Sequence, residues 1–178
     1  MKPARKIAAG PVPQIGPEID MLVEAGDWPA RAKLRALAAR DLGAAIAAAR
    51  PPLAEGSEIS LVFTDNAHMR VLNRRYRRKD KPTNVLSFPA PAASAKTFGP
   101  LLGDIVLAAE TVAAEAKAGK VPLDHHLAHL IIHGFLHLLG HDHVRAGEAA
   151  VMEGLETAIL AGLGIADPYG RALPKKTG

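Results

Sequence analysis

The segment from residue 127 to residue 143 constrains this chain more than any other. Its sequence, LAHLIIHGFLHLLGHDH, holds five of the eight histidines among closely spaced aliphatic residues. Positions four apart lie on one face of a helix, so His133 and His137 can direct their imidazoles at one point. Gly140 suits the left-handed conformation that ends a helix. Beyond it the chain can turn back and bring His143 to the same point.

Buried histidines need partners for their ring nitrogens. Each imidazole placed in an apolar helix costs a few kcal/mol unless its ring nitrogens find partners. A metal ion supplies such partners, and three neutral imidazoles suit Zn²⁺ with a fourth position left open for water or substrate. The spacing therefore predicts a catalytic zinc site with one ion per chain, although imidazoles also suit Cu, Ni and Fe. The competing interpretation is a histidine-rich structural helix.

Composition narrows the class of protein. A chain of 178 residues suits one domain, and 48% apolar residues with only 4% aromatic residues predict an aliphatic core. The chain has no cysteine, which excludes disulfides and thiolate metal ligands. No stretch resembles a signal peptide or a membrane span, so we expect a cytoplasmic protein with no membrane partner.

A second feature is the basic run from residue 70 to residue 81, RVLNRRYRRKDK, which has seven basic residues and one acid. At helical spacing its cations form a stripe opposite Met69, Leu72 and Tyr76. A concentrated cationic face is what contacts to the phosphates of a polyanionic partner need, whereas the alternative is an ordinary solvated helix face. The candidate residues for such contacts are Arg70, Arg74, Arg78, Lys79 and Lys81.

The rest of the pattern predicts a single α+β domain, a small mixed sheet packed with helices. Strands are expected at 19–23, 58–63, 84–88 and 101–108. Helices are expected from a cap at Asp27 to residue 49, from a cap at Thr64 or Asp65 to about residue 80, and at 110–118, 124–139 and 146–163. We expect a flexible N-terminus over 1–17, one metal-dependent hydrolase domain over 18–166, and a C-terminal tail over 167–178.

The histidine spacing also matches the metzincin proteases, H-E-x-x-H-x-x-G-x-x-H. In those enzymes the glutamate after the first histidine acts as the general base. Gly134 stands at that position here and has no side chain to accept a proton. A metallopeptidase is therefore the weaker alternative.

Three motifs together resemble a known family. They are YRRKDKPTNVLSFP at 76–89, LGDI at 102–105 and HGFLHLLGHDH at 133–143. They closely resemble the YbeY family of bacterial rRNA maturation factors, over roughly residues 59–169. The resemblance implies a zinc-dependent, single-strand-specific endoribonuclease that acts in rRNA maturation, including 16S rRNA 3′ end processing, and in ribosome quality control. It implies rRNA, the ribosome and possible ribosomal proteins as partners, and no nucleotide cofactor.

The resemblance also implies roles for individual residues. The family's three zinc ligands fall on His133, His137 and His143, and its functionally important arginine falls on Arg77. His141 stands where some relatives carry tyrosine, which makes it a poor ligand candidate. Lys79, Asp80, Thr83 and Asn84 match the family motif without an assigned role.

Phosphodiester chemistry agrees with this assignment. Cleavage needs stabilisation of charge on the phosphate more than it needs a carboxylate base, and zinc with Arg77 can supply it. Candidate bases are water, the RNA 2′-hydroxyl and His129. His129, Asp142 and Asp104 are candidate hydrogen-bond partners of the ligands, with a structural role as the alternative for Asp104. A different class remains open: a ribosome-assembly or RNA-binding factor with structural zinc and little intrinsic cleavage.

Overall fold

The computed structural model describes residues 16–91, 97–141 and 146–170. Within these residues four strands and five helices form one domain, so the predicted α+β class is confirmed. The strands are β1 (Glu18–Val23), β2 (Glu58–Thr64), β3 (Val85–Pro89) and β4 (Leu101–Ala108). The helices are α1 (Arg31–Ala49), α2 (Asn66–Arg77), α3 (Ala109–Gly119), α4 (Leu123–Leu138) and α5 (Ala146–Gly162). None of the described helices is long and apolar enough to cross a membrane.

The sheet is mixed, as predicted, with the strand order β1-β2-β4-β3. Strands β1, β2 and β4 are parallel, and β3 runs antiparallel to β4 with Ser87 opposite Ile105. Strand β3 is therefore an edge strand, and only one of its sides is paired within the sheet.

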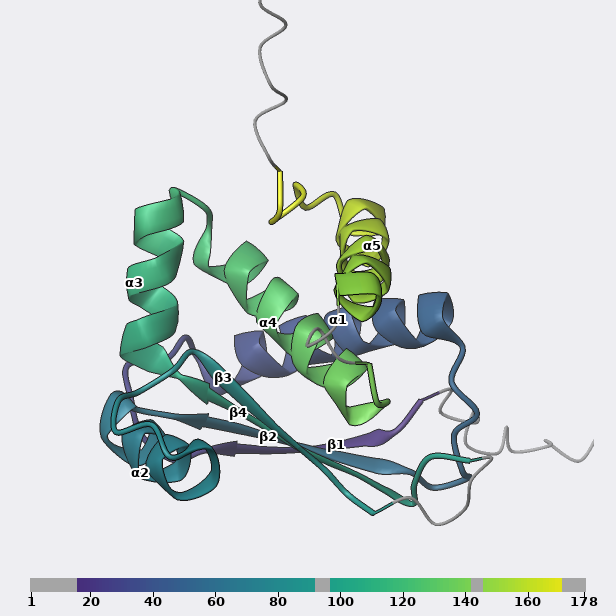
Figure 1. Ribbon diagram of the computed structural model, residues 1–178, viewed down its shortest axis with the longest axis horizontal. Coiled ribbons are helices and arrows are strands. Elements are labelled where there is room, and N and C mark those ends of the chain that lie inside the picture. The colour runs from purple at the N-terminus through teal and green to yellow at the C-terminus, as the bar shows by residue number, and fades with distance from the viewer. Residues whose placement is uncertain (1–15, 92–96, 142–145, 171–178) are drawn as a thin grey trace, which may run out of the picture.

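The two faces of the sheet are covered by different helices (Figure 1). Ile105 and Leu107 of β4 belong to the large core that includes buried residues of α1, α4 and α5. Val106 and Ala108, which point to the other face because side chains alternate along a strand, pack in a smaller cluster with Met69 of α2. Helix α2 therefore lies on the face opposite to the histidine helix α4.

Two helix boundaries differ from the prediction. Helix α1 begins after Ala30 and is not capped by Asp27. The indole of Trp28 donates to the carbonyls of Ala25 and Thr64, at 3.0 and 3.1 Å, which anchors the preceding segment to the end of β2. The helix can therefore begin only beyond this anchor.

Helix α2 starts as predicted and ends early. The Asp65 carboxylate accepts a hydrogen bond from the backbone N–H of His68 at 2.9 Å, a normal N-terminal cap. At the other end Arg78 adopts the left-handed conformation, with φ 57°, and its N–H bonds back to Arg74. Lys79 and Lys81 consequently lie beyond the helix rather than on its stripe.

Helix α4 ends where the glycine predicts. Gly140 has a φ of 84°, and the N–H of His141 reaches the carbonyl of Leu136 at 3.0 Å. This left-handed termination turns the chain sharply after the histidine helix, as the sequence requires if a later histidine is to return toward it.

Candidate metal centre

Four histidines follow one stripe of α4. His126, His129, His133 and His137 are spaced by three or four residues, and all four are half-buried. The remaining faces of the helix carry apolar residues that pack into the core. The amphipathic pattern of α4 is therefore unusual, because imidazoles replace the solvated charges of an ordinary surface helix.

The rings of His133 and His137 meet at their Nε2 atoms, which lie 3.1 Å apart. Two imidazole nitrogens bound to one tetrahedral zinc ion would be about 3.3 Å apart, given Zn–N bonds of 2.0–2.1 Å. The separation suits two ligands of one ion, and it is also the length of a hydrogen bond between the two rings. The geometry is therefore compatible with a metal ion bound by these two residues.

Glu156 of α5 fixes the orientation of His133. Its side chain is fully buried, and its Oε1 accepts a hydrogen bond from Nδ1 of His133 at 2.6 Å. A neutral imidazole that carries its proton on Nδ1 keeps the lone pair on Nε2. A carboxylate behind a histidine is the usual device by which proteins orient a metal ligand and raise its basicity.

The other carboxylate oxygen of Glu156 is also occupied. The hydroxyl of Tyr169 donates to Oε2, and Nε2 of His129 lies 3.4 Å from the same atom. His129 Nε2 is also 3.1 Å from the Tyr169 hydroxyl oxygen. Because Tyr169 gives its one proton to Glu156, both groups facing His129 Nε2 are acceptors, and this nitrogen must carry a proton.

The electrostatics of Glu156 follow from these contacts. Burial alone would raise the pKa of its carboxyl, yet the pKa falls to about 2 because three hydrogen bonds stabilise the anion. The donors are His129, His133 and Tyr169. Burial, and then the adjacent carboxylate, raise the pKa of Tyr169 well above its ordinary value, so its hydroxyl stays a donor.

His129, His133 and Glu156 bring three potential ligand atoms within 4.8 Å of one another and could hold a metal ion. In the observed arrangement, however, donors face acceptors throughout this group. Its atoms satisfy one another as a hydrogen-bond network, whereas the Nε2 atoms of His133 and His137 converge from two rings. Two ligand sets thus compete, and they share His133.

Gly134 lies against the sheet. A Cβ at this position would come within 2.8 Å of Ile105 Cγ2 and 3.0 Å of Ser87 Oγ. A side chain at this position would require the side chains of Ile105 and Ser87 to move. The metzincin glutamate therefore has no place in this site, in agreement with the sequence analysis.

The remaining predicted site residues lie in different surroundings. His143 and Asp142 fall outside the described residues, so the third predicted ligand has no described position. Asp104 is exposed and points to the same face of β4 as Val106, away from α4. This placement disfavours Asp104 as a hydrogen-bond partner of His133 or His137.

The basic residues are on the other side of the sheet. Arg77 is the last residue of α2 and is exposed, as are Arg74, Arg78, Lys79 and Lys81. Arg70 is different, because its Nε and Nη2 donate to both carboxylate oxygens of Asp80, at 2.9 and 2.8 Å. The charge of Arg70 is thus largely neutralised, which makes it a weaker phosphate contact than its neighbours.

Sequence reasoning missed Glu156 and Tyr169. Glu156 lies four residues after Met152 and three before Ile159, on the buried stripe of α5. A carboxylate in such a stripe requires buried partners, and this signal was present in the sequence. Tyr169 was assigned to the tail, whereas the structure packs it against His129 and Glu156.

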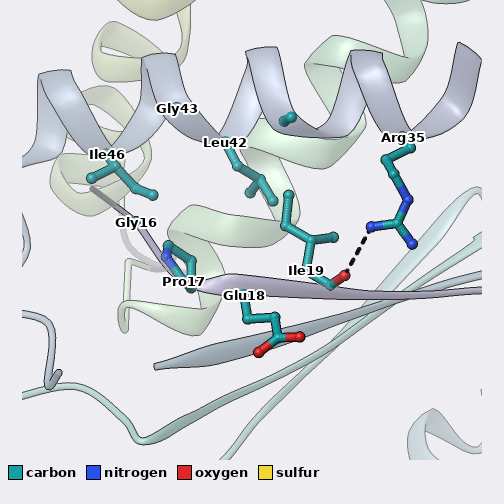
Figure 2. Close-up of a pocket in the computed structure, with 9 residues that line it drawn as sticks. Gly16, Pro17, Glu18, Ile19, Arg35, Leu42, Gly43 and Ile46 are labelled. Carbon is teal, nitrogen blue, oxygen red and sulfur yellow. Dashed lines mark hydrogen bonds between the residues drawn. The ribbon is translucent and has the colours of Figure 1, made fainter. Parts of the chain in front are cut away.

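A cavity of about 580 Å³ lies elsewhere, between β1 and α1 (Figure 2). At one end of this cavity the side chain of Arg35 reaches from α1 to β1, where its Nη1 donates to the carbonyl of Ile19 at 3.4 Å. Strands β1 and β3 form opposite edges of the sheet, and α4 packs against β3. This cavity lacks histidines and does not contribute to the metal centre.

The fold and the site together define a single-domain α+β protein with a candidate metal centre on a histidine helix. Comparison with known proteins identifies the family. The family model described as Endoribonuclease YbeY matches residues 31–164. Curated proteins of that name from Rhizobium meliloti and Sinorhizobium fredii are 50% and 48% identical, covering 88% and 86% of this chain and 97% and 92% of theirs. The chain belongs to the endoribonuclease YbeY family.

A solved structure supports the fold alone. The solution structure of TM1509 from Thermotoga maritima matches with a TM-score of 0.51 at 20% identity. The match covers 86% of this chain and 99% of that protein. The fold is thus shared at low sequence identity.

Proposed function

We propose that this chain is a zinc-dependent endoribonuclease that cuts single-stranded RNA during rRNA maturation, including the 3′ end of 16S rRNA, and in ribosome quality control. Membership of the endoribonuclease YbeY family supports the reaction class. The single observation that carries the metal dependence is the 3.1 Å approach of the Nε2 atoms of His133 and His137.

The ligands we propose are His133, His137 and His143, with Glu156 as the positioning residue behind His133. The alternative set of His129, His133 and Glu156 requires breaking the hydrogen bonds that Glu156 already accepts. It also requires a deprotonated Nε2 on His129, which faces two acceptors. The histidine set requires the loss of the hydrogen bond between the Nε2 atoms of His133 and His137, and it leaves the hydrogen bonds of Glu156 in place.

When bound, zinc would polarise the scissile phosphate and lower the pKa of a bound water. The chain's own residues would do the rest. Glu156 holds the proton of His133 on Nδ1, and Tyr169 with His129 holds the carboxylate of Glu156 in place. Gly134 lets α4 approach β3 and β4 closely.

Strand β3 offers a route between the two faces of the sheet. Helix α4 packs on one side of β3, and on the other side Tyr76 of α2 contacts Phe88, with ring centroids 4.9 Å apart. An RNA strand that passes the free edge of β3 can therefore reach both the metal centre and the cations of α2. We propose Arg77 as the principal phosphate contact on this route, with Arg74, Arg78, Lys79 and Lys81 adding charge.

Cleavage of an end-labelled single-stranded RNA by metal-stripped protein, with and without added zinc, tests the proposal. We expect cutting that zinc restores, that duplex RNA does not undergo, and that identically purified His137→Ala protein lacks. Absence of cutting by folded, zinc-loaded protein would contradict the proposal and favour a ribosome-assembly factor with structural zinc.

A further inference from the structure

A second cavity, of about 390 Å³, adjoins the metal centre. It lies between α3, the first half of α4, and the segment that follows α5. Leu160 and Ile165 contribute buried apolar surface, and His125, His126 and His129 contribute rings. His129 belongs both to this cavity and to the network around Glu156.

Two carboxylates line the cavity, Glu115 and Asp167. Glu115 is held by Nδ2 of Asn84, at 3.0 Å from Oε2, and by Nε2 of His126 at 2.8 Å. Asp167 accepts hydrogen bonds at Oδ1 from the N–H of Tyr169, at 2.8 Å, and from the Thr157 hydroxyl, at 3.1 Å. Both acceptors are thus fixed before any ligand arrives.

The charge of these groups selects the ligand. Two carboxylates disfavour a phosphate and favour a group that presents N–H donors. Among the described residues they are not part of a cluster that gathers three potential metal ligands, so a cation is a poorer match than a hydrogen-bond donor. The histidine rings and the apolar surface suit a flat aromatic ring.

A nucleobase with an amino group combines these properties. Carboxylate side chains accept hydrogen bonds from the amino groups of bases. Guanine presents two neighbouring N–H groups on its Watson–Crick edge, whereas uracil presents one, so guanine offers more donors to these carboxylates. Bases of single-stranded RNA can be splayed out and stacked on histidine in this way.

The cavity is close enough to the proposed reaction centre to matter. The ring centroids of His129 and His133 are 6.1 Å apart, about one helical turn. A single nucleotide can span that length. A base seated in the cavity would therefore belong to a nucleotide next to the phosphate at the metal centre.

We propose that this cavity is a base-recognition subsite that selects an amino-bearing base, guanine above all, beside the scissile phosphate, with Glu115 and Asp167 as the specificity-determining residues. The inference rests on the proposed endoribonuclease function. It adds a sequence preference to an activity that would otherwise depend on charge alone.

The first test uses short single-stranded RNAs that differ only in guanosine or uridine at one position, scanned along the strand. At one position relative to the cut we expect kcat/KM to be about tenfold higher for guanosine. Asp167→Asn and Glu115→Gln should each lower this ratio toward unity with the zinc content unchanged. Glu148→Gln, an exposed glutamate outside the cavity, is the matched control and should preserve the ratio.

The second test needs no cleavage. Guanosine should shift the NMR signals of the His125 and His126 ring protons in the wild-type protein and less in Asp167→Asn, and uridine should shift them little. Equal shifts with both nucleosides, or none, together with an unchanged cleavage ratio in both variants, would overturn the inference. Shifts with guanosine in a protein that cuts no RNA would contradict the proposed function and leave the subsite standing.

Discussion

The two faces of the sheet hold polar groups under opposite conditions. On the α4 face, His133, Glu156 and Tyr169 are wholly or partly buried and satisfy one another through short contacts. On the α2 face, the side chains of Arg77 and of the basic residues near it are exposed. Burial forces a fixed geometry on the first group, and exposure leaves the second to act mainly through charge. The first suits chemistry and the second suits electrostatic attraction of a strand.

The buried network of the α4 face should have the largest effect, which is on the stability of the metal-free protein in acid. The pKa of Glu156 is about 2 in the fold against 4.5 as the ordinary value, so its stabilising contribution is present above pH 4.5 and is lost as the pH falls through 2. This contribution is on the order of 3 kcal/mol. Urea unfolding between pH 2 and 6 measures it, and Glu156→Gln should flatten the curve over that range.

Asp41 of α1 provides the matched control, because it is also fully buried. Burial raises its pKa above 3.8, despite the Arg40 hydrogen bond, and within the described residues its Oδ2 has no partner. The pH dependence of stability therefore has the opposite sign for Asp41. Its contribution to the free energy of unfolding is greatest below pH 3.8 and is lost as the pH rises through the raised pKa. Asp41→Asn should leave the acid loss intact, and an acid loss that vanished with Asp41→Asn would contradict the account.

Metal affinity should show the next effect. Glu156→Gln keeps the shape of the side chain but removes the charge behind His133, and such a change typically weakens metal binding by about 10- to 100-fold. Competition with a chromogenic zinc chelator measures it. Glu148→Gln in the same helix is the control, and an equal loss in both variants would show that Glu156 has no special role.

The close approach of α4 to the sheet can be tested through its glycine. Gly134→Ala places a methyl group against Ile105 and Ser87, and overpacking of this kind costs about 1–3 kcal/mol. In contrast, Gly154 of α5 has no atom within 4 Å of an added Cβ, and Gly154→Ala should stabilise the protein by up to about 1 kcal/mol. Thermal unfolding of both variants measures these changes in stability. An unchanged stability of Gly134→Ala would contradict the claim that α4 and the sheet leave no room for a side chain at this position.

The smallest expected effects lie on the α2 face. Arg77→Ala should weaken binding of single-stranded RNA and reduce the slope of log K against log salt by about one, with zinc retained. Arg70→Ala should change the slope less, because Asp80 already neutralises Arg70. Fluorescence anisotropy over a range of salt concentrations compares them. Equal slopes for the two variants would show that pairing with Asp80 does not reduce the contribution of Arg70 relative to that of Arg77.

Periodicity predicted much of the fold because it reflects burial. The strand residues Ile59, Leu61 and Phe63 alternate and face one core, and Gly140 ends α4 in the left-handed conformation. The boundaries that were wrong depend on contacts distant in sequence. Trp28 is anchored to Thr64, which delays α1, and no local pattern announces that bond.

The candidate site was predictable only in part for the same reason. The helical spacing placed His133 and His137 on one helix face, and their Nε2 atoms lie 3.1 Å apart. Glu156 of α5 contacts His133 from 23 residues away, and Tyr169 of the segment beyond α5 contacts His129 from 40 residues away. Local spacing cannot reveal such partners. The charged residue in the apolar stripe of α5 was the available clue.

The most direct test of the central claim is the zinc content of two single variants after dialysis against zinc, measured by atomic emission. The histidine ligand set predicts that His129→Ala retains one zinc per chain and that His137→Ala loses it, with both proteins folded by circular dichroism. Loss of zinc from His129→Ala with retention by His137→Ala would contradict the account and make His129, His133 and Glu156 the ligands.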